Sequence, residues 1–256
     1  MKQGIGLLSI IPLRRDPSEQ SEMVSQLLFG EAYEITEETS AWYKILTQFD
    51  QYAGWIDKKM FSPVSGEYYE KLELGGYTVS APVARIAASD NSLLYITAGS
   101  TLEKKPENGI INIDNLSFRL MDPLHESGIS HHGRITGIAK QFLHSPYQWG
   151  GRSTFGFDCS GFTQIVYKIN SMRLPRDASR QAVVGKAVNS FHELNEGDLV
   201  FFCNEENTVV HVGLAMPPDS IIHCSGMVRI DRLDEQGIFN PQLNQYTHKL
   251  HSVRRI

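Results

Sequence analysis

The spacing of apolar residues changes near residue 125. Before this point, short runs rich in aromatic and β-branched residues alternate with turn residues such as Gly30, Asp50 and Asn108. Runs of this kind are typical of strands, and no apolar stripe extends over four helical turns. The pattern therefore predicts β structure throughout residues 1–122. The expected β segments are residues 5–13, 32–35, 41–47, 54–57, 77–80, 83–87, 93–97 and 110–113.

After residue 125 the pattern is first helical and then alternating. Apolar residues recur at helical spacing before Pro146, over residues 135–143, and again over about 159–170. Asp177 is a suitable N-cap for a short third helix that ends near Gly185. Segments of period two follow and predict antiparallel strands, so this half is expected to form an α+β domain. The expected strands are residues 199–202, 209–216, 220–224 and 227–231.

The apolar run from Ile5 to Leu13 has two interpretations, a buried strand or a short signal peptide. Gly6, Ser9 and Pro12 interrupt it, a single lysine precedes it, and no small-residue cleavage site follows. We interpret it as a strand. The sequence therefore predicts a cytoplasmic protein, exported only if the N-terminus has been processed or replaced.

Composition and charge exclude several classes of protein. The 256 residues carry 24 Lys and Arg against 29 Asp and Glu, a net charge of -5, which disfavours a dedicated nucleic-acid-binding protein. No apolar run reaches the ~18 residues of a membrane span. The three cysteines, Cys159, Cys203 and Cys224, are odd in number and widely spaced, which excludes a disulfide framework. CxxC and HExxH motifs are absent, so a standard zinc site is not expected, and no GxGxxG or P-loop motif indicates a nucleotide-binding loop. We expect no metal or organic cofactor.

Cys159 is the strongest candidate nucleophile. A glycine-rich loop, YQWGGRSTFGF, leads directly into the predicted helix that begins at about Cys159. The N-terminus of a helix presents free N–H groups and a partial positive charge, and both stabilise a thiolate. The sequence therefore predicts a lowered pKa for Cys159, early alkylation by iodoacetamide, and covalent catalysis. Cys203 ends a strand and is expected in the core, whereas Cys224 is expected on the opposite strand face from His223.

Two histidines on neighbouring predicted strands are candidates for the base. His211 shares a strand face with the small residues Gly213 and Ala215, which leave room beside its ring, and His223 follows on the next strand. Taken alone, either histidine would be interpreted as a hydrogen-bonded residue of the core. Together they predict a Cys–His–His relay, in which the second histidine holds the first in the correct tautomer. The other histidines are expected at helix ends, in strands or on the surface: His125, His131, His132, His144, His192, His248 and His251.

Five separated motifs occur in the order found in one known family. They are the YQWGG loop that begins at Tyr147, FDCSGF, GDLVFF, HVGLA and IIHCSG. Over about residues 130–256 they resemble the NlpC-type papain-like cysteine peptidases of bacterial cell walls. Upstream, WYKI and YAGWID resemble a bacterial SH3 domain, and residues 77–122 resemble a second, more divergent one. Two such domains before this catalytic domain resemble the γ-D-glutamyl-L-diamino acid endopeptidases of the dipeptidyl-peptidase VI type, which recycle murein peptides.

The resemblance implies a multi-domain chain. Two small all-β SH3-like barrels, residues 1–70 and 71–124, would precede an α+β papain-like peptidase domain, residues 125–256. The peptidase would cut between γ-D-Glu and meso-diaminopimelate or L-Lys in murein stem peptides with a free N-terminal L-Ala. The murein peptide is then the expected partner, with no nucleic acid and no membrane.

The resemblance also implies roles for individual residues. Cys159 would be the nucleophile, His211 the base and then the acid, and His223 its orienter. Tyr147 would donate its hydroxyl to the oxyanion, an interaction worth about 3 kcal/mol; otherwise it packs under the loop. Trp149 would form a wall of the cleft, and Asp158 and Ser160 would contact the substrate beside the nucleophile. Asp177 would supply a second carboxylate; otherwise it is a plain N-cap. Glu22 and Tyr52 would contact the substrate amine.

Three alternatives stay open at this point. A lytic endopeptidase acting on intact, exported wall would use the same residues, although no clear signal peptide supports export. A non-catalytic wall-binding protein would rely on exposed SH3 surfaces, and the intact nucleophile, base and orienter argue against it. An acyltransferase or amidase on the same fold is the third, because thioester chemistry serves all of these reactions.

Overall fold

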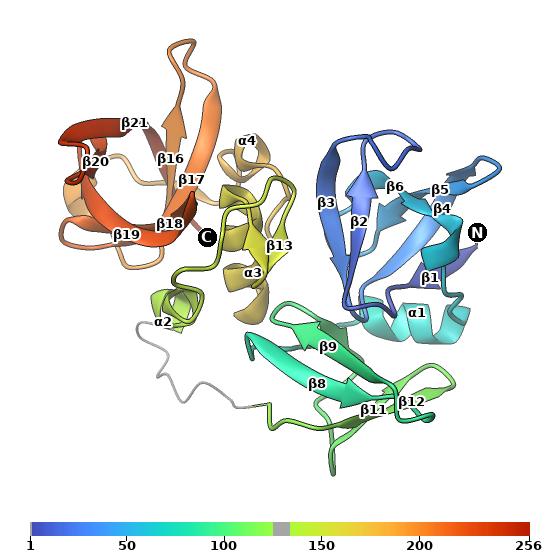
Figure 1. Ribbon diagram of the computed structural model, residues 1–256. Helices are drawn as coiled ribbons and strands as arrows, with labels where there is room; N and C mark the ends of the chain where they lie inside the picture. The colour runs from blue at the N-terminus through green and yellow to red at the C-terminus, as the bar shows by residue number, and fades with distance from the viewer. Residues whose placement is uncertain (1, 125–133) are drawn as a thin grey trace. The chain divides into compact units, whose positions relative to one another are not determined.

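The computed structural model describes residues 2–124 and 134–256, and the chain divides into two compact units (Figure 1). The first unit contains Met1–Ser127 and Trp149–Thr154, and the second contains Gly128–Gln148 and Phe155–Ile256. The predicted start of the peptidase domain at residue 125 and the histidines His125, His131 and His132 lie outside the described residues. Within the described ranges, no helix combines the length and the apolar character that a membrane span requires.

A six-stranded antiparallel sheet forms one part of the first unit, in the order β1-β4-β5-β6-β2-β3. Alternate residues of its strands point to one side and build a core that includes Leu13, Ile45 and Ile56. Gly54 permits close packing there, because a Cβ at this position would lie 3.1 Å from the side chain of Leu13. The strands are β1 (Gln3–Ile5), β2 (Ile10–Arg14), β3 (Met23–Leu28), β4 (Ala32–Glu38), β5 (Trp42–Thr47) and β6 (Ala53–Asp57), and the 3-10 helix η1 (Lys58–Met60) follows.

The other part of the first unit contains a helix, a four-stranded sheet β11-β12-β8-β9 and the strand pair β10-β7. One hydrophobic core joins the two parts, since Ile5 and Phe29 belong to the same buried cluster as Leu72 and Ile113. The predicted domain limit between residues 70 and 71 falls inside the helix. The elements are α1 (Gly66–Glu73), β7 (Tyr77–Thr78), β8 (Val83–Ala87), β9 (Leu93–Thr97), β10 (Thr101–Leu102), β11 (Ile110–Ile113) and β12 (Leu116–Leu120).

Two expectations for this half are wrong. The uninterrupted β structure is broken by α1, whose eight residues are too few for helical spacing to stand out and which begins at the N-cap Ser65. The single strand expected over residues 5–13 is two strands, β1 and β2, that are separated at Gly6. A Cβ at Gly6 would lie 2.8 Å from the carbonyl oxygen of Leu28, so this close approach of two backbones requires glycine.

The second unit is built on a seven-stranded antiparallel sheet in the order β15-β21-β16-β17-β18-β19-β20. Because β20 also pairs with β21, six of these strands close into a ring. The predicted strand over residues 209–216 is confirmed, and β20 and β21 are additional to the prediction. The strands are β15 (Lys186–Ala187), β16 (Leu199–Cys203), β17 (Val209–Met216), β18 (Ser220–Ser225), β19 (Met227–Asp234), β20 (Gly237–Asn240) and β21 (Gln245–Arg255).

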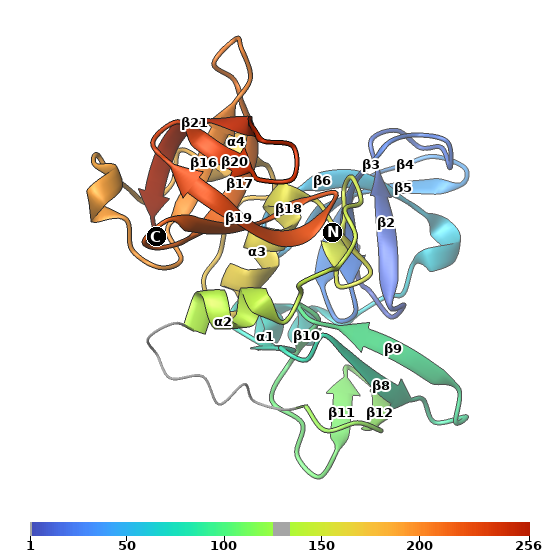
Figure 2. The ribbon, with the colours of Figure 1, turned by 60° about the vertical axis from the view of Figure 1, so that its left-hand side comes forward.

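Three helices of the second unit pack against this sheet. Both views place α2 (Arg134–Lys140) and α3 (Cys159–Ile169) on the same side of β17 and β18 (Figure 1, Figure 2). The predicted helix at about 159–170 is confirmed as α3, whose residues Phe162, Ile165 and Val166 are fully buried. The remaining elements of the second unit are β14 (Gly156–Phe157), α4 (Ala178–Gln181) and the 3-10 helix η2 (Phe191–Glu193), whereas β13 (Arg152–Ser153) belongs to the first unit.

Candidate active site

Cys159 is the first residue of α3, and local hydrogen bonds define this helix start. Asp158 is the N-cap, and its carboxylate accepts from the backbone N–H of Gly161 at 2.7 Å. Cys159 is 8% exposed, and the backbone N–H groups of Ser160 and Val212 both donate toward its sulfur. Since Val212 belongs to β17, these contacts place the thiol beside the strand that carries His211.

The expected lowering of the Cys159 pKa is wrong. Burial, reinforced by the Asp158 carboxylate, raises the pKa of the thiol to about 11. The N–H groups of Val212 and Ser160 and the guanidinium of Arg176 act in the opposite direction without offsetting the loss of solvent. The resting nucleophile is therefore a neutral thiol, and a base must remove its proton during attack.

This finding leads to a prediction for alkylation. A thiol of pKa about 11 holds roughly 100-fold less thiolate at pH 8 than one with the ordinary value of 9.0. Iodoacetamide should therefore modify Cys159 slowly at neutral pH, with a rate that rises toward pH 11. Mass spectrometry of the Cys159 peptide after timed alkylation between pH 6 and 11 measures this rate. A rate that levels off near pH 7 would indicate a preformed thiolate and contradict the assignment.

Asp158 and Ser160, both predicted to contact substrate, accept hydrogen bonds from the same buried arginine. Arg176 donates to the Asp158 carboxylate through both terminal nitrogens, the longer contact being 2.9 Å, and to the Ser160 hydroxyl at 3.0 Å. All three residues are more than nine-tenths buried. This ion pair fixes the loop residue before the nucleophile, and sequence analysis did not single out Arg176.

The two predicted histidines are brought together by neighbouring strands. Nε2 of His211 on β17 lies 2.8 Å from Nδ1 of His223 on β18, and their rings are inclined by 85°. Gly213 pairs directly with His223, and a Cβ on Gly213 would lie 2.7 Å from that of His223. The missing side chain of Gly213 therefore leaves room for His223. Both histidines are buried, with 6% and 1% exposure.

The hydrogen-bond chain continues to a residue that sequence analysis missed. Nε2 of His223 lies 3.0 Å from Oδ2 of Asp231 on β19, and Arg229 donates to the other carboxylate oxygen at 2.8 Å. Burial would raise the pKa of Asp231, but the hydrogen bonds from His223 and Arg229 outweigh it and hold that pKa below its usual value. Asp231 is therefore an ionised, buried carboxylate at the end of the histidine pair.

His248 is a third ring at this position. It lies on β21 and stacks on His211, with ring centres 4.3 Å apart and planes inclined by 32°. Sequence analysis placed it among ordinary surface or strand histidines. Burial, with a smaller contribution from His223, lowers the pKa of His248 to about 4.

His211 is suited to act as a base at neutral pH. Burial, followed by the neighbouring His223 and His248, holds the pKa of His211 well below 6.5. A depressed pKa keeps the imidazole neutral above pH 6.5, so one ring nitrogen is available to accept a proton.

Tyr147 lies near the thiol and stays protonated. Burial, followed by the proximity of Cys159 and Asp158, raises the pKa of its hydroxyl to about 12. Its backbone N–H donates to the carbonyl of Gly226 at 2.9 Å, which fixes the residue at the turn between β18 and β19. A protonated hydroxyl near the sulfur can donate a hydrogen bond to an oxyanion.

Two of the predicted substrate contacts meet each other in the first unit. The indole N–H of Trp149 donates to the carboxylate of Glu22 at 2.6 Å, and Arg15 pairs with the other oxygen at 2.7 Å. Trp149 is 61% exposed. Tyr52 is partly buried against the core of the six-stranded sheet. Asp177, in the second unit, occupies the N-cap position of α4, although its side chain accepts no capping hydrogen bond.

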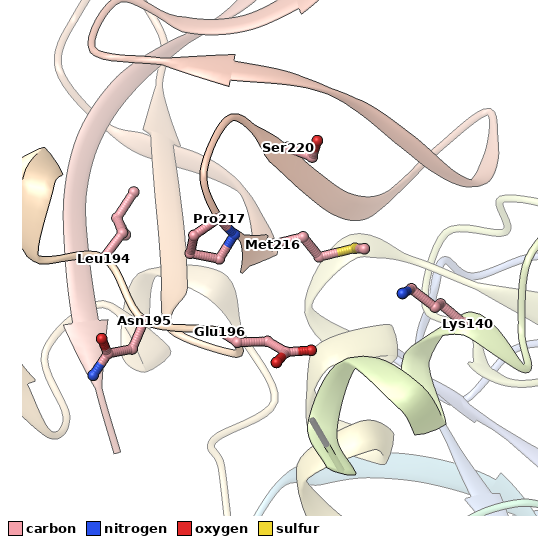
Figure 3. Close-up of a pocket in the computed structure, with 7 residues that line it drawn as sticks. All are labelled: Lys140, Leu194, Asn195, Glu196, Met216, Pro217 and Ser220. Atoms are coloured by element: carbon pink, nitrogen blue, oxygen red, sulfur yellow. The ribbon is translucent and has the colours of Figure 1, made fainter. Parts of the chain in front are cut away.

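The other cysteines, and a cavity at the far end of β17, carry no part of this arrangement. Cys203 is buried at the end of β16, as predicted, and Cys224 donates its S–H to the carbonyl of Phe157 on the opposite face of β18 from His223. Among the described residues, no three His, Cys, Asp or Glu side chains are grouped to hold a metal ion. A cavity of about 560 Å³ lies at the turn between β17 and β18, at the other end of β17 from His211 (Figure 3). It is lined by Lys140, Leu194, Asn195, Glu196, Met216, Pro217 and Ser220.

Comparison with known proteins identifies the chain. Residues 144–247 match the NlpC/P60 family, and residues 13–60 match the bacterial dipeptidyl-peptidase Sh3 domain. The chain is 30% identical over 219 residues to the gamma-D-glutamyl-L-lysine dipeptidyl-peptidase of Bacillus subtilis (strain 168), covering 78% of this chain and 71% of that protein. The protein of the same name from Bacillus cereus is 26% identical, over 79% of this chain and 67% of its own length.

A solved structure shares the fold. The crystal structure of an NlpC/P60 family protein from Bacillus cereus matches with a TM-score of 0.82 and 21% identity, over 99% of both chains. The family match includes Tyr147, Cys159 and both histidines. The chain therefore belongs to the NlpC/P60 family of cysteine peptidases and carries an SH3-like N-terminal domain of the bacterial dipeptidyl-peptidase type.

Proposed function

We propose that this protein hydrolyses the bond between γ-D-Glu and the diamino acid, meso-diaminopimelate or L-Lys, in murein stem peptides with a free N-terminal L-Ala. The observation that carries the proposal is the combination of an NlpC/P60 domain with a dipeptidyl-peptidase SH3 domain in one chain. Relatives named gamma-D-glutamyl-L-lysine dipeptidyl-peptidase match over 79% and 78% of this chain. Free peptides are products of wall turnover, so the proposed role is peptide recycling, in the cytoplasm.

The proposed reaction has two steps. The sulfur of Cys159 attacks the γ-carbonyl of D-Glu while His211 takes the thiol proton, and Tyr147 donates to the oxyanion of the tetrahedral intermediate. His211 then gives its proton to the departing amine of the diamino acid, which leaves a thioester on Cys159. In the second step His211 deprotonates water, which attacks the thioester; the C–S bond breaks, His211 returns the proton to the departing sulfur of Cys159, and L-Ala-γ-D-Glu is released. His223 orients His211 throughout.

Six residues are proposed to bind the peptide. Glu22 is the proposed partner of the L-Ala ammonium, with Tyr52 as a hydrogen-bond partner. Its carboxylate is already oriented by Trp149 and Arg15, which favours a fixed acceptor over a mobile surface group. The other proposed contacts are Trp149, Asp158, Ser160 and Asp177.

Acetylation of the peptide N-terminus tests the amine contact. It removes the positive charge and adds bulk, and a charge-assisted hydrogen bond contributes roughly 1–3 kcal/mol. We expect kcat/KM for L-Ala-γ-D-Glu-diaminopimelate to fall tenfold or more on acetylation. Glu22→Gln should lower the rate on the free peptide and reduce this ratio, whereas Glu19→Gln, a neighbouring exposed carboxylate that lies 3.8 Å from Arg14, is the matched control.

Intact sacculi complete this experiment, because their L-Ala is amide-linked to muramic acid and carries no charge. The proposal predicts that they are poor substrates. Equal rates on free and acetylated peptides, with release of peptide from sacculi, would instead make the protein a lytic endopeptidase. Binding to sacculi without cleavage of any peptide would favour a wall-binding protein.

A further inference from the structure

The chain of hydrogen bonds through the two histidines has a direction, and Asp231 sets it. Asp231 is 7% exposed and is held in its ionised form by His223 and Arg229. A carboxylate can only accept hydrogen bonds, so Nε2 of His223 must carry the proton of their 3.0 Å contact. A neutral imidazole with a proton on Nε2 has a lone pair on Nδ1.

The tautomer of His223 in turn fixes that of His211. Because Nδ1 of His223 accepts, Nε2 of His211 must donate across the 2.8 Å contact between the rings. The proton of neutral His211 is then on Nε2, and its lone pair is on Nδ1. His211 thus has one nitrogen committed to orientation and the other free to take a proton.

We propose that Asp231 is a positioning residue of the peptidase, which acts through His223 to hold His211 in the tautomer whose Nδ1 is the base. The proposal deepens the proposed function, since it rests on His211 as the base of that reaction. It gives the relay four members, Cys159, His211, His223 and Asp231, of which only the first two touch reacting atoms.

The register of β18 and β19 explains how Asp231 reaches His223. His223 pairs with Arg229. Asp231 pairs with Ile221, and this second pair lies two residues further from the hairpin turn on both strands. Alternation places all four side chains on one face of the sheet. The carboxylate therefore lies between the imidazole and the guanidinium, with one oxygen committed to each.

Arg229 makes the test of this proposal directional. In an Asp231→Asn variant the amide offers one oxygen and one NH2 group. Arg229 can only donate, so it keeps the oxygen and the NH2 group faces Nε2 of His223. Nε2 of His223 must then accept a hydrogen bond, so the proton of His223 moves to its Nδ1. Nδ1 of His223 now donates to Nε2 of His211, so the proton of His211 moves to its own Nδ1. The substitution reverses the chain and blocks the base.

The expected effect of Asp231→Asn is a fall in kcat on the order of 10²–10³-fold, with a smaller change in KM. The estimate lies below the roughly 10⁴-fold loss for Asp→Asn in a serine triad, because a second histidine intervenes here. Adding Arg229→Ala to Asp231→Asn frees the amide to turn its oxygen to His223, and should raise kcat at least about tenfold above the single variant. Asp234→Asn, the same change on the same strand at a carboxylate bound to Tyr246, is the control and should keep kcat near the parent value.

Nitrogen-15 NMR of histidine-labelled protein reads the tautomers without substrate. The parent should show His211 and His223 as neutral rings protonated on Nε2, and Asp231→Asn should show both protonated on Nδ1. Thermal unfolding of each variant separates a reversed chain from a misfolded one.

Each outcome bears on a different claim. A parent spectrum with His211 protonated on Nδ1, or a charged His223 ring, overturns the proposal. So does loss of activity in Asp231→Asn with unchanged tautomers, or a double variant no more active than the single one. If the parent shows the expected tautomers but cleaves no γ-D-glutamyl peptide, the relay stands and the proposed substrate fails.

Discussion

Replacing Cys159 by serine is expected to lower kcat on L-Ala-γ-D-Glu-diaminopimelate on the order of 10⁴-fold or more while the fold persists. The loss of a nucleophile in a comparable triad costs this much or more. The loss of activity is expected to be larger here than in an enzyme whose cysteine is already a thiolate. The pKa of His211 lies well below 6.5, so it is a weak base, and it can remove a proton from a thiol far more readily than from a hydroxyl.

Cys203→Ser is the matched control, because Cys203 is also a buried cysteine at the end of a regular element. Its kcat should match the parent. Product formation by liquid chromatography and thermal unfolding should be measured for both variants. Full activity in Cys159→Ser, or a loss confined to Cys203→Ser, would remove Cys159 from the mechanism.

Breaking the buried ion pair between Arg152 and Glu31 is expected to destabilise the first unit by about 3–5 kcal/mol. Arg152 is 1% exposed and binds both carboxylate oxygens of Glu31 at 2.9 Å. It also donates to the carbonyl of Gln26 at 2.6 Å. In Arg152→Met the Glu31 carboxylate stays buried without its main counter-charge, which accounts for the large loss. Arg152 lies in the segment Trp149–Thr154, which belongs to the first unit.

Urea unfolding measures this loss, and the chain supplies a specific probe. All three tryptophans, Trp42, Trp55 and Trp149, belong to the first unit, so their fluorescence follows its unfolding. Arg85→Met is the matched control, since it removes an exposed arginine that is also bound to a carboxylate, and should leave the midpoint nearly unchanged.

A second variant separates charge from packing. Adding Glu31→Gln to Arg152→Met removes the uncompensated charge and keeps an acceptor for the Leu28 N–H. It should restore part of the lost stability. If Arg152→Met shifts the midpoint no more than Arg85→Met, the buried pair does not stabilise the first unit.

Local signals explain which parts of the site were predictable. The start of α3 follows from a glycine-rich loop and helical apolar spacing, both close to Cys159 in the sequence. The shared face of His211 and Gly213 follows from alternation along one strand. These features need only the period of a single element.

The parts that could not be predicted depend on contacts between distant segments. Glu31 and Arg152 are 121 residues apart, and neither has a local pattern that marks it as a buried partner. His248 lies on β21, a strand of mostly exposed or half-exposed residues whose position is set by pairing with β16 and β20. The prediction of a lowered Cys159 pKa is wrong for a related reason. The helix N-terminus, which was expected to lower the pKa, is a local feature, whereas burial, which raises it, depends on tertiary structure.

Asp231 is an intermediate case. The turn at Gly226 makes β18 and β19 a hairpin, and counting outward from it pairs His223 with Arg229 and puts Asp231 on the same face. The sequence therefore contained a usable signal, which was the register of the hairpin. Reading it requires the turn position to within one residue, because a shift of one would reverse the faces.

The central claim is that Cys159 carries the L-Ala-γ-D-Glu group during turnover, and acid quenching tests it most directly. Protein mixed with L-Ala-γ-D-Glu-diaminopimelate is quenched within a few turnovers, digested and mapped by mass spectrometry, with Cys159→Ser in parallel. The account predicts the mass of the acyl dipeptide on the peptide that contains Cys159, none on the peptides of Cys203 or Cys224, and free L-Ala-γ-D-Glu only from the parent. Hydrolysis of the same bond by Cys159→Ser at the parent rate, or an acyl group on another cysteine, would contradict it.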